Sequence, residues 1–161
     1  MTILGIGVDI IENNRLRNLI NYKSFVSRTF GEKEMYPAKK FKKKNIRTSL
    51  FINPSLNDIK ITKLIGADCV EIHTGKFANL IKSKKNYLRE FERIKKCSVL
   101  AEKLSIEVHA GHGLDYKTAK LLTKIKQIKE FNIGHYLVGE SIFYGLNTVI
   151  KNFKKIIKRK I

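Results

Sequence analysis

Short apolar runs alternate along this chain with longer segments in which apolar residues recur every three or four positions. The runs predict strands at residues 48–52, 69–73, 106–110 and 131–133. Each predicted strand is followed by a segment with helical spacing. A strand followed by a helix, four times in succession, predicts an α/β fold with a parallel sheet and right-handed crossovers.

Residues typical of helix starts and helix ends flank the segments between these strands. Ser55 followed by Asp58 is typical of a capped helix start, and Gly66 is typical of a helix end. Four apolar residues between them are expected to share one buried helix face: Leu56, Ile59, Leu64 and Ile65. Further helices are predicted over residues 85–104, over residues 115–125 with Asp115 as the cap, and between residues 137 and 157.

The N-terminal part of the chain has a different pattern. Residues 2–8 form an apolar run that predicts a short strand, and residues 12–21 have helical spacing. A polar, basic stretch at residues 36–44, around Pro37, is the best candidate for a boundary. We therefore expect a short strand–helix segment at residues 1–40 and a separate unit at residues 41–161.

The length and composition fit one domain of ordinary size. With 161 residues, 43% of them hydrophobic, the chain can build a core, but a complete eight-unit α/β barrel needs at least about 200 residues. No apolar stretch is long enough to span a membrane, and no secretory signal is evident. Cys69 and Cys97 lie in apolar segments and are expected to be buried thiols in a reducing compartment, which favours a cytoplasmic location.

The net charge of +19 suggests a polyanion as a partner, but the type of basic residue argues against it. The chain has 26 Lys and only 7 Arg, whereas proteins that read phosphates and bases favour Arg. The lysines are spread over the expected solvent faces of helices, with denser runs at residues 39–44 and 151–160. Solvated helix faces are the favoured interpretation, and nucleic-acid binding is the alternative.

Four histidines follow the predicted strands: His73, His109, His112 and His135. Each lies at or just after the C-terminal end of a strand, where parallel α/β folds build their ligand sites. Taken singly, such a histidine is more often a structural hydrogen-bond partner. The four together predict a site at this end of the sheet.

Glu71 strengthens the prediction of a site. Residues i and i+2 of a strand share a face, so Glu71 and His73 point the same way, while Val70 and Ile72 point toward the covering helices. A carboxylate there needs a partner, such as a histidine or a substrate amine. The alternatives are a buried Glu–His pair that only fixes the strand, and a site for zinc or another divalent ion built from Glu71 and three histidines.

Two glycines in the last predicted loops suit phosphate binding. Gly113 and Gly134 have no Cβ, so their backbone N–H groups can approach phosphate oxygens closely. The late loops of α/β barrels often provide such a site. Each glycine stands next to a histidine, and this pairing makes the prediction of a phosphate site more specific than the glycines alone would.

Four motifs together resemble the C-terminal half of pyridoxine 5'-phosphate synthase. They are RTSLFI at residues 47–52, EIHTG at 71–75, AGHGL at 110–114 and NIGH at 132–135. They occur in the family's order and at about the expected spacing. The resemblance covers about residues 42–161.

The resemblance implies a fold and an activity. The family is a TIM-type (β/α) barrel, so the chain would form about four C-terminal βα units of one. The family condenses 1-deoxyxylulose 5-phosphate with 3-amino-2-oxopropyl phosphate to pyridoxine 5'-phosphate in vitamin B6 biosynthesis, without a metal or an organic cofactor. By resemblance, His112 would be the general acid and Glu71 would assist proton transfer or hold the amine. Gly113, Gly134 and His135 would hold a substrate phosphate.

The start of the chain resembles a different family. GIGVDI at residues 5–10, followed by Phe25, Arg28, Phe30 and Glu34, resembles the start of holo-acyl-carrier-protein synthase, over about residues 1–38. That family transfers phosphopantetheine from coenzyme A and uses Mg²⁺, for which Asp9 would be a ligand. Its second metal-binding motif is absent here, so a turn residue after a strand is the other interpretation of Asp9. The chain is thus interpreted as a fusion of a truncated N-terminal piece with a half barrel.

A half barrel has consequences of its own. Its two open sheet edges and uncovered inner face predict self-association into a homo-oligomer. The resemblance covers only the family's C-terminal half. In that family, the first half supplies a further catalytic histidine, a catalytic glutamate and substrate-binding arginines. A phosphosugar-binding fragment without turnover therefore remains an alternative to the synthase, as does a phosphopantetheine transferase.

Overall fold

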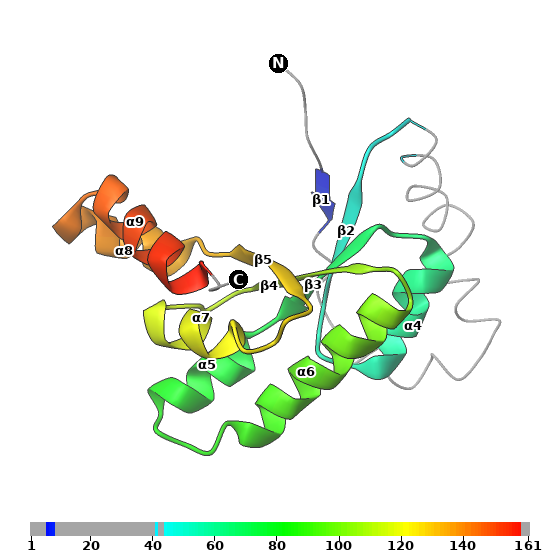
Figure 1. The fold of residues 1–161 in the computed structure, drawn as a ribbon, viewed down its shortest axis with the longest axis horizontal. Helices are drawn as coiled ribbons and strands as arrows, with labels where there is room; N and C mark the ends of the chain where they lie inside the picture. The colour runs from blue at the N-terminus through cyan, green and yellow to red at the C-terminus, as the bar shows by residue number, and fades with distance from the viewer. Residues whose placement is uncertain (1–5, 9–40, 42–43, 159–161) are drawn as a thin grey trace.

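A computed structural model of the chain describes residues 6–8, 41 and 44–158 (Figure 1). Within this part, the strands form one parallel sheet in the order β1–β2–β3–β4–β5. The strands are β1 (Ile6–Val8), β2 (Thr48–Ile52), β3 (Cys69–His73), β4 (Glu107–Gly111) and β5 (Ile128–Asn132). The predicted parallel α/β sheet is confirmed, and its strands follow one another in sequence order, as in a TIM-type barrel.

Helices α4 to α7 cover one face of this sheet (Figure 1). Helices α8 and α9 pack against each other, and α9 contacts α7. The helices are α4 (Leu56–Ile65), α5 (Gly75–Lys82), α6 (Leu88–Lys103), α7 (Tyr116–Leu122), α8 (His135–Tyr144) and α9 (Leu146–Ile157). The arrangement is a partial barrel wall, with helices outside and the opposite face of the sheet inside.

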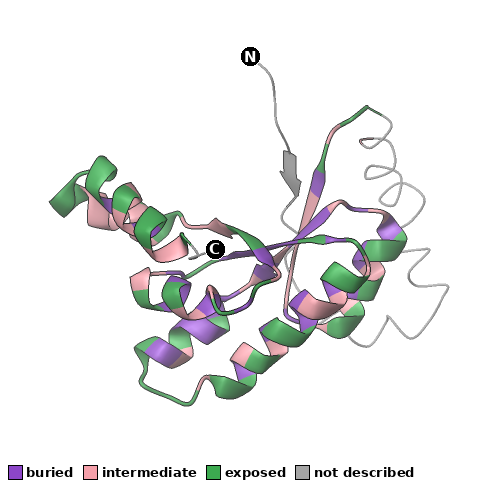
Figure 2. Ribbon diagram, in the orientation of Figure 1, coloured by how far each residue is buried: buried purple, intermediate pink, exposed green. Residues whose placement is uncertain are grey.

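The core lies between the sheet and its helices. Alternate strand residues, among them Val70, Ile72 and Val108, are at most 1% exposed and pack against helix residues such as Ile59 and Phe77. Figure 2 shows these buried positions where strands and helices face each other. The prediction that Val70 and Ile72 point toward the helices is confirmed. The opposite face of the strands carries Phe51 together with polar side chains such as Glu71 and Asn132, and it forms the wall of the site.

Helix α4 begins and ends where the sequence predicts. Ser55 Oγ accepts the Asp58 N–H at 3.4 Å, and Gly66 ends the helix with a left-handed φ of 81°. The predicted helix face is partly wrong, however, because Leu56 and Leu64 are 47% and 67% exposed.

Thr62 is buried on this helix face, where those two leucines were predicted to be. It lies one helical turn from Ile59 and Ile65, and it is 1% exposed. Its hydroxyl donates to the Asp58 carbonyl at 2.8 Å, so a polar residue can be buried there without an unpaired group.

The remaining element bounds differ from the prediction in the second half of the sheet. Strands β2 and β3 have the predicted bounds, whereas β4 begins one residue later than expected. Strand β5 begins at Ile128 rather than at residue 131. The sequence pattern missed this start because Lys129 and Glu130 are polar and exposed, which is not typical of a buried strand. Helix α5 was not predicted, since the helix expected after the strand at residues 69–73 was the one over residues 85–104.

A buried ion pair fastens α6 to the loop before α4. Glu90 is 4% exposed, and both of its carboxylate oxygens accept from Arg93, at 3.1 and 2.9 Å. Arg93 also donates to the Pro54 carbonyl at 2.9 Å. The guanidinium thus joins two elements that are far apart in the sequence.

Replacing Arg93 with methionine is expected to lower the free energy of unfolding by about 2 kcal/mol. Among the described residues, the buried Glu90 carboxylate would keep the ion pair with Lys76, whose side chain is 66% exposed and lies 3.5 Å away. Urea unfolding measures the loss. The control is Lys95→Met, which breaks an exposed 3.8 Å pair with Glu92 and should change stability by about 0.5 kcal/mol or less. Equal losses in the two variants would contradict the assigned role of Arg93.

Both cysteines are buried and form no disulfide, as predicted. Burial raises the pKa of the Cys97 thiol to about 11, so this thiol stays protonated near neutral pH. Among the helices of the described residues, none has the length and apolarity needed to cross a membrane. Asp9, the predicted helix at 12–21 and most of the expected boundary at 36–44 lie outside the described residues.

Candidate functional site

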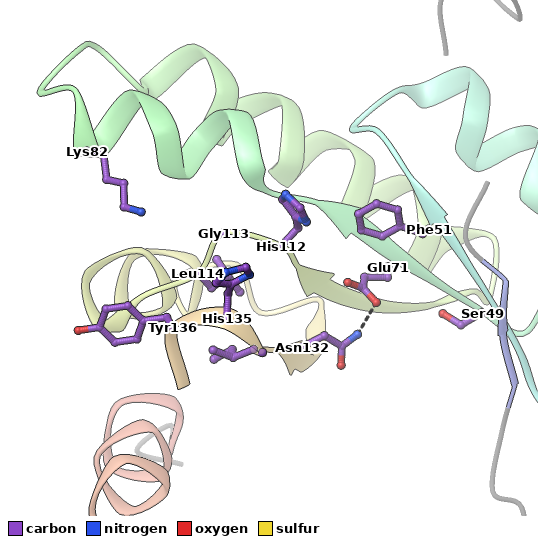
Figure 3. Close-up of a pocket in the computed structure, with 12 residues that line it drawn as sticks. Ser49, Phe51, Glu71, Lys82, His112, Gly113, Leu114, Asn132, His135 and Tyr136 are labelled. Atoms are coloured by element: carbon purple, nitrogen blue, oxygen red, sulfur yellow. Dashed lines mark hydrogen bonds between the residues drawn. The ribbon is translucent and has the colours of Figure 1, made fainter. Parts of the chain in front are cut away.

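A cavity of about 980 Å³ opens at the C-terminal ends of strands β2 to β5 (Figure 3). It is lined by Ser49, Phe51, Glu71, Lys82, His112, Gly113, Leu114, Asn132, Ile133, Gly134, His135 and Tyr136. All five residues predicted as site residues are among them: Glu71, His112, Gly113, Gly134 and His135. The sheet therefore brings together residues that are as many as 64 positions apart, from 71 to 135, because the strand ends share one edge.

Glu71 extends from β3 into this cavity and is held by Asn132 on β5. The Asn132 amide donates to Glu71 Oε2 at 2.6 Å. Burial raises the pKa of Glu71, while the Asn132 hydrogen bond and the nearby His109 act in the opposite direction. The carboxyl is thus oriented, half-buried and able to exchange a proton at a higher pH than an exposed glutamate.

Gly111 on β4 makes room for this carboxylate. A Cβ at position 111 would overlap Glu71 Oε1 and would lie 3.0 Å from the Asn132 Cβ. The glycine lies in register with His73 on the neighbouring strand β3. Its lack of a side chain lets Glu71 reach across β4 toward Asn132.

Asn132→Leu is expected to raise the pKa of Glu71 further, because the amide that favours the carboxylate would be lost. A carboxyl with a raised pKa in the folded state gives stability that is present at low pH. That stability is lost as the pH rises from 4.5, the ordinary pKa of a glutamate, through the pKa of Glu71 in the folded state. Because the variant has the higher folded-state pKa, its loss of stability should extend to higher pH. A ¹³C NMR titration of the Glu71 carboxyl measures the change. Asn57→Leu, on the exposed side of α4, is the control, and equal titrations in the two variants would contradict the role of Asn132.

His112 begins the loop after β4 in an uncommon backbone conformation. Its φ is 74°, in the left-handed region, and the next residue, Gly113, has a φ of 76°. For a residue with a side chain this conformation costs about 1–2 kcal/mol, so surrounding contacts must hold it. Strained residues of this kind cluster at functional sites.

Aromatic packing places the His112 ring. The ring centroid lies 4.6 Å from that of His73, which in turn lies edge-on to Phe51 at 5.1 Å. Gly75 is required beside them, since a Cβ there would lie 2.8 Å from His112 Cδ2 and 2.9 Å from His73 Nε2. The two imidazoles also line a second, smaller pocket of about 430 Å³ next to the main cavity.

The other end of the cavity is suited to an anion. Gly134 precedes α8 and His135 is its first residue, so the unpaired N–H groups of the first helical turn lie at the cavity wall. No acidic side chain lies in that turn, and Gly134 has open space where a Cβ would be. Lys82 of α5 lines the same cavity and adds a positive charge.

His109 is not at the strand end, contrary to the prediction. Because β4 begins one residue later than expected, His109 lies in the middle of the strand and is only 6% exposed. Its Nε2 lies 2.9 Å from Glu107 Oε1, and its Nδ1 lies 3.6 Å from Glu130 Oε1. Glu107 also pairs with Arg47 at 2.7 Å, and these two contacts hold the pKa of Glu107 below its ordinary value. His109 is thus part of a polar cluster with Arg47, Glu107 and Glu130 on the inner face of the sheet.

The zinc alternative is not supported by the geometry. No group of three His, Cys, Asp or Glu side chains in the described part of the chain is placed to bind a metal ion. The alternative that Glu71 pairs only with a histidine is also wrong in detail, because its hydrogen-bond partner is the amide of Asn132. Asp9, the candidate magnesium ligand, lies outside the described residues.

Several lining residues were missed by sequence reasoning, notably Asn132, Lys82 and Phe51. Asn132 stands in the NIGH motif, but nothing in the sequence pairs it with Glu71 across 61 positions. Lys82 is one of 26 lysines and is the last residue of α5, a helix that was not predicted, so no sequence signal distinguishes it. The alternation of faces in β2 could have identified Phe51, which pairs with Glu71 in register.

Comparison with known proteins gives a consistent result. The family model described as pyridoxal phosphate biosynthesis protein PdxJ matches residues 32–159. Over 119 residues the chain is 61% identical to the pyridoxine 5'-phosphate synthase of Pelagibacter ubique, covering 74% of this chain and 50% of that protein. It is 43% identical to that of a Sulfurihydrogenibium species over 119 residues, which are 74% and 48% of the two chains.

A third relative shows the same coverage. The chain is 40% identical over 129 residues to the pyridoxine 5'-phosphate synthase of Bdellovibrio bacteriovorus, covering 80% of this chain and 53% of that protein. The chain therefore spans about half the length of the curated relatives it matches.

Proposed function

The chain belongs to the family of the pyridoxal phosphate biosynthesis protein PdxJ, and from that membership we propose that its site serves pyridoxine 5'-phosphate synthesis. The proposed reaction condenses 1-deoxyxylulose 5-phosphate with 3-amino-2-oxopropyl phosphate. Its products are pyridoxine 5'-phosphate, inorganic phosphate and two molecules of water. The observation that carries the proposal is one cavity in which Glu71, His112 and the start of α8 face a common space.

Each of these groups has a part in the proposed reaction. The N–H groups of Gly113 and Gly134, with His135, bind a substrate phosphate at the start of α8. His112, whose imidazole lines the same cavity, donates a proton to the oxygen that leaves during imine formation and dehydration. Glu71 accepts a proton or holds the substrate amine, and its raised pKa suits an exchange of protons closer to neutral pH.

The proposal includes no metal and no organic cofactor. Amine condensation with a ketone, dehydration and ring closure are all proton-transfer chemistry, for which imidazole and carboxyl groups suffice. We also propose a cytoplasmic location, which is supported by two buried thiols that form no disulfide.

The first test is a thermal melt of the purified chain with 1-deoxyxylulose 5-phosphate, followed by assay of pyridoxine 5'-phosphate. The proposal expects the melting temperature to rise with the sugar phosphate but not with heparin, and expects product. A shift with heparin only would favour the polyanion alternative. A shift with the sugar phosphate but no product would favour the phosphosugar-binding fragment. Either result contradicts the proposed synthesis.

For residues 1–38 we propose an origin in holo-acyl-carrier-protein synthase, which rests on the motif at residues 5–10. A phosphopantetheine transferase would consume coenzyme A in a magnesium-dependent reaction. That consumption should disappear in Asp9→Asn. Consumption that is absent in the wild-type chain, or unchanged in the variant, would leave the segment without transferase function.

We further propose that two or more copies of this chain associate through the apolar surface of α8 and the start of α9. No residue of α8 is buried. Four large apolar side chains at the end of α8 and the start of α9 are 52–81% exposed: Ile142, Phe143, Tyr144 and Leu146. A group of large exposed apolar side chains of this kind is typical of an interface. Strand β5, which precedes α8, is the edge strand of the described sheet and can pair with another chain.

Phe143→Glu is expected to weaken this self-association at least about tenfold, since a buried Phe contributes about 1.5–3 kcal/mol. Sedimentation velocity over a concentration series measures the change. Leu64→Glu, at a 67% exposed position on α4, is the control and should leave the association unchanged. A wild-type chain that sediments as a monomer throughout the series would contradict the proposal.

A further inference from the structure

Thr74 connects the end of β3 to the start of α5, and its hydroxyl is used in an uncommon way. Thr74 stands at the N-cap of α5, where a threonine side chain ordinarily accepts a hydrogen bond from the first helical turn. Here it makes no such bond. The residue is fully buried, so its hydroxyl must find partners elsewhere.

Those partners are both on the loop that carries His112. The Thr74 Oγ1 lies 2.6 Å from the Gly111 carbonyl oxygen and 2.8 Å from the His112 carbonyl oxygen, so its one hydroxyl proton is shared between these two acceptors. The Thr74 backbone N–H also donates to the Gly111 carbonyl, at 2.8 Å. One residue of the β3–α5 connection thus makes three contacts with two successive carbonyl groups after β4.

These contacts lie on both sides of the His112 Cα. The carbonyls on either side of the His112 Cα are both held, and His112 has the left-handed φ of 74°. Fixing both peptide groups fixes the direction of the side chain between them. Immediately after Thr74, Gly75 leaves the space in which the rings of His112 and His73 pack.

We propose that Thr74 is a positioning residue for the His112 imidazole, acting through the two carbonyl groups that its hydroxyl binds. The helix cap that the hydroxyl gives up is a local cost of the kind that proteins bear at functional sites. The inference rests on the proposed function for the role of His112. The placement of the ring itself does not depend on turnover.

The experiment compares three variants of the full chain. Thr74→Val keeps the shape of the side chain and removes the hydroxyl, and Thr74→Ser keeps the hydroxyl. The control is Thr62→Val, which removes another buried hydroxyl that donates to a backbone carbonyl, at 2.8 Å, but lies on α4. The signal is the imidazole Cε1–H resonance of His112 in ¹H–¹³C NMR spectra, assigned with His112→Asn. His109 and His135 serve as internal references.

The expected result is a displaced His112 resonance in Thr74→Val, with His109 and His135 unmoved, and a wild-type resonance in Thr74→Ser and Thr62→Val. Binding of inorganic phosphate should weaken by about threefold to tenfold in Thr74→Val, as for the loss of one hydrogen bond near Gly113. An unmoved His112 resonance in Thr74→Val, or an equal displacement in Thr62→Val, would overturn the inference.

Two further outcomes are separated by this design. If Thr74→Val does not fold, Thr74→Cys replaces it, because its thiol fills the space but is a weak donor. If the wild-type chain binds no phosphate, the proposed function fails, while the NMR comparison still decides the role of Thr74.

Discussion

His112→Asn is expected to lower the rate of pyridoxine 5'-phosphate formation by about 10²–10⁴-fold relative to the wild-type chain. Among the residues that line the cavity, His112 is the one to which the proposal assigns proton donation to the departing oxygen, a task suited to an imidazole. Asparagine is the suitable replacement, because it tolerates the left-handed backbone at this position better than most residues. The loss should therefore report chemistry rather than a disturbed loop.

The matched variant is His135→Asn, at the phosphate end of the same cavity. His112→Asn should lower kcat and leave binding of the sugar phosphate largely unchanged. His135→Asn should weaken that binding, raising KM more than it lowers kcat. Steady-state kinetics and a thermal-melt titration measure both effects. Similar kinetic changes in the two variants would contradict the division of the cavity into a proton-transfer end and a phosphate end.

Gly111→Ala is expected to lower kcat by about 10²-fold, although it adds only one methyl group. The new Cβ would overlap the Glu71 carboxylate, so Glu71 must move and lose its 2.6 Å hydrogen bond with Asn132. Overpacking at this buried position should also lower the free energy of unfolding by about 1–3 kcal/mol. Product formation and urea unfolding are both measured.

The matched control is Gly139→Ala, in the middle of α8, where an added Cβ would meet nothing within 4 Å. Alanine is the better helix former, so this variant should be unchanged in activity and slightly more stable, by about 0.5–1 kcal/mol. If Gly111→Ala kept wild-type activity, the proposed need for an oriented Glu71 carboxylate would be wrong.

The sequence pattern predicted the fold where strands have an apolar face and clear ends. Strands β2 and β3 were predicted with their observed bounds, and Ser55, Gly66 and Asp115 were identified as helix caps. These signals are local, since a cap or an alternation of faces is decided by residues a few positions apart. The pattern failed at β5, where Lys129 and Glu130 interrupt the apolar run, and at α5, whose start resembles a turn.

The same distinction applies to the candidate site. The motifs identified Glu71, His112, Gly113, Gly134 and His135, and all of them line the cavity. The sequence placed His109 with them as well, but a shift of one residue in β4 puts it in the middle of the strand. There it pairs with Glu107 and Glu130. A period-two pattern cannot by itself say where a strand ends, so strand-end residues are predicted only to within about a residue.

By itself, then, the sequence determined the order of strands and helices, the edge of the sheet at which the site lies, and the family. Only the tertiary structure decided how the site residues are held. Asn132 orients Glu71 from 61 positions away, and Thr74 holds the backbone of His112 from 38 positions away. These contacts depend on the register between neighbouring strands and on the path of two loops. Register and loop path are set by the packing of the whole sheet, which leaves no signal at the residues concerned.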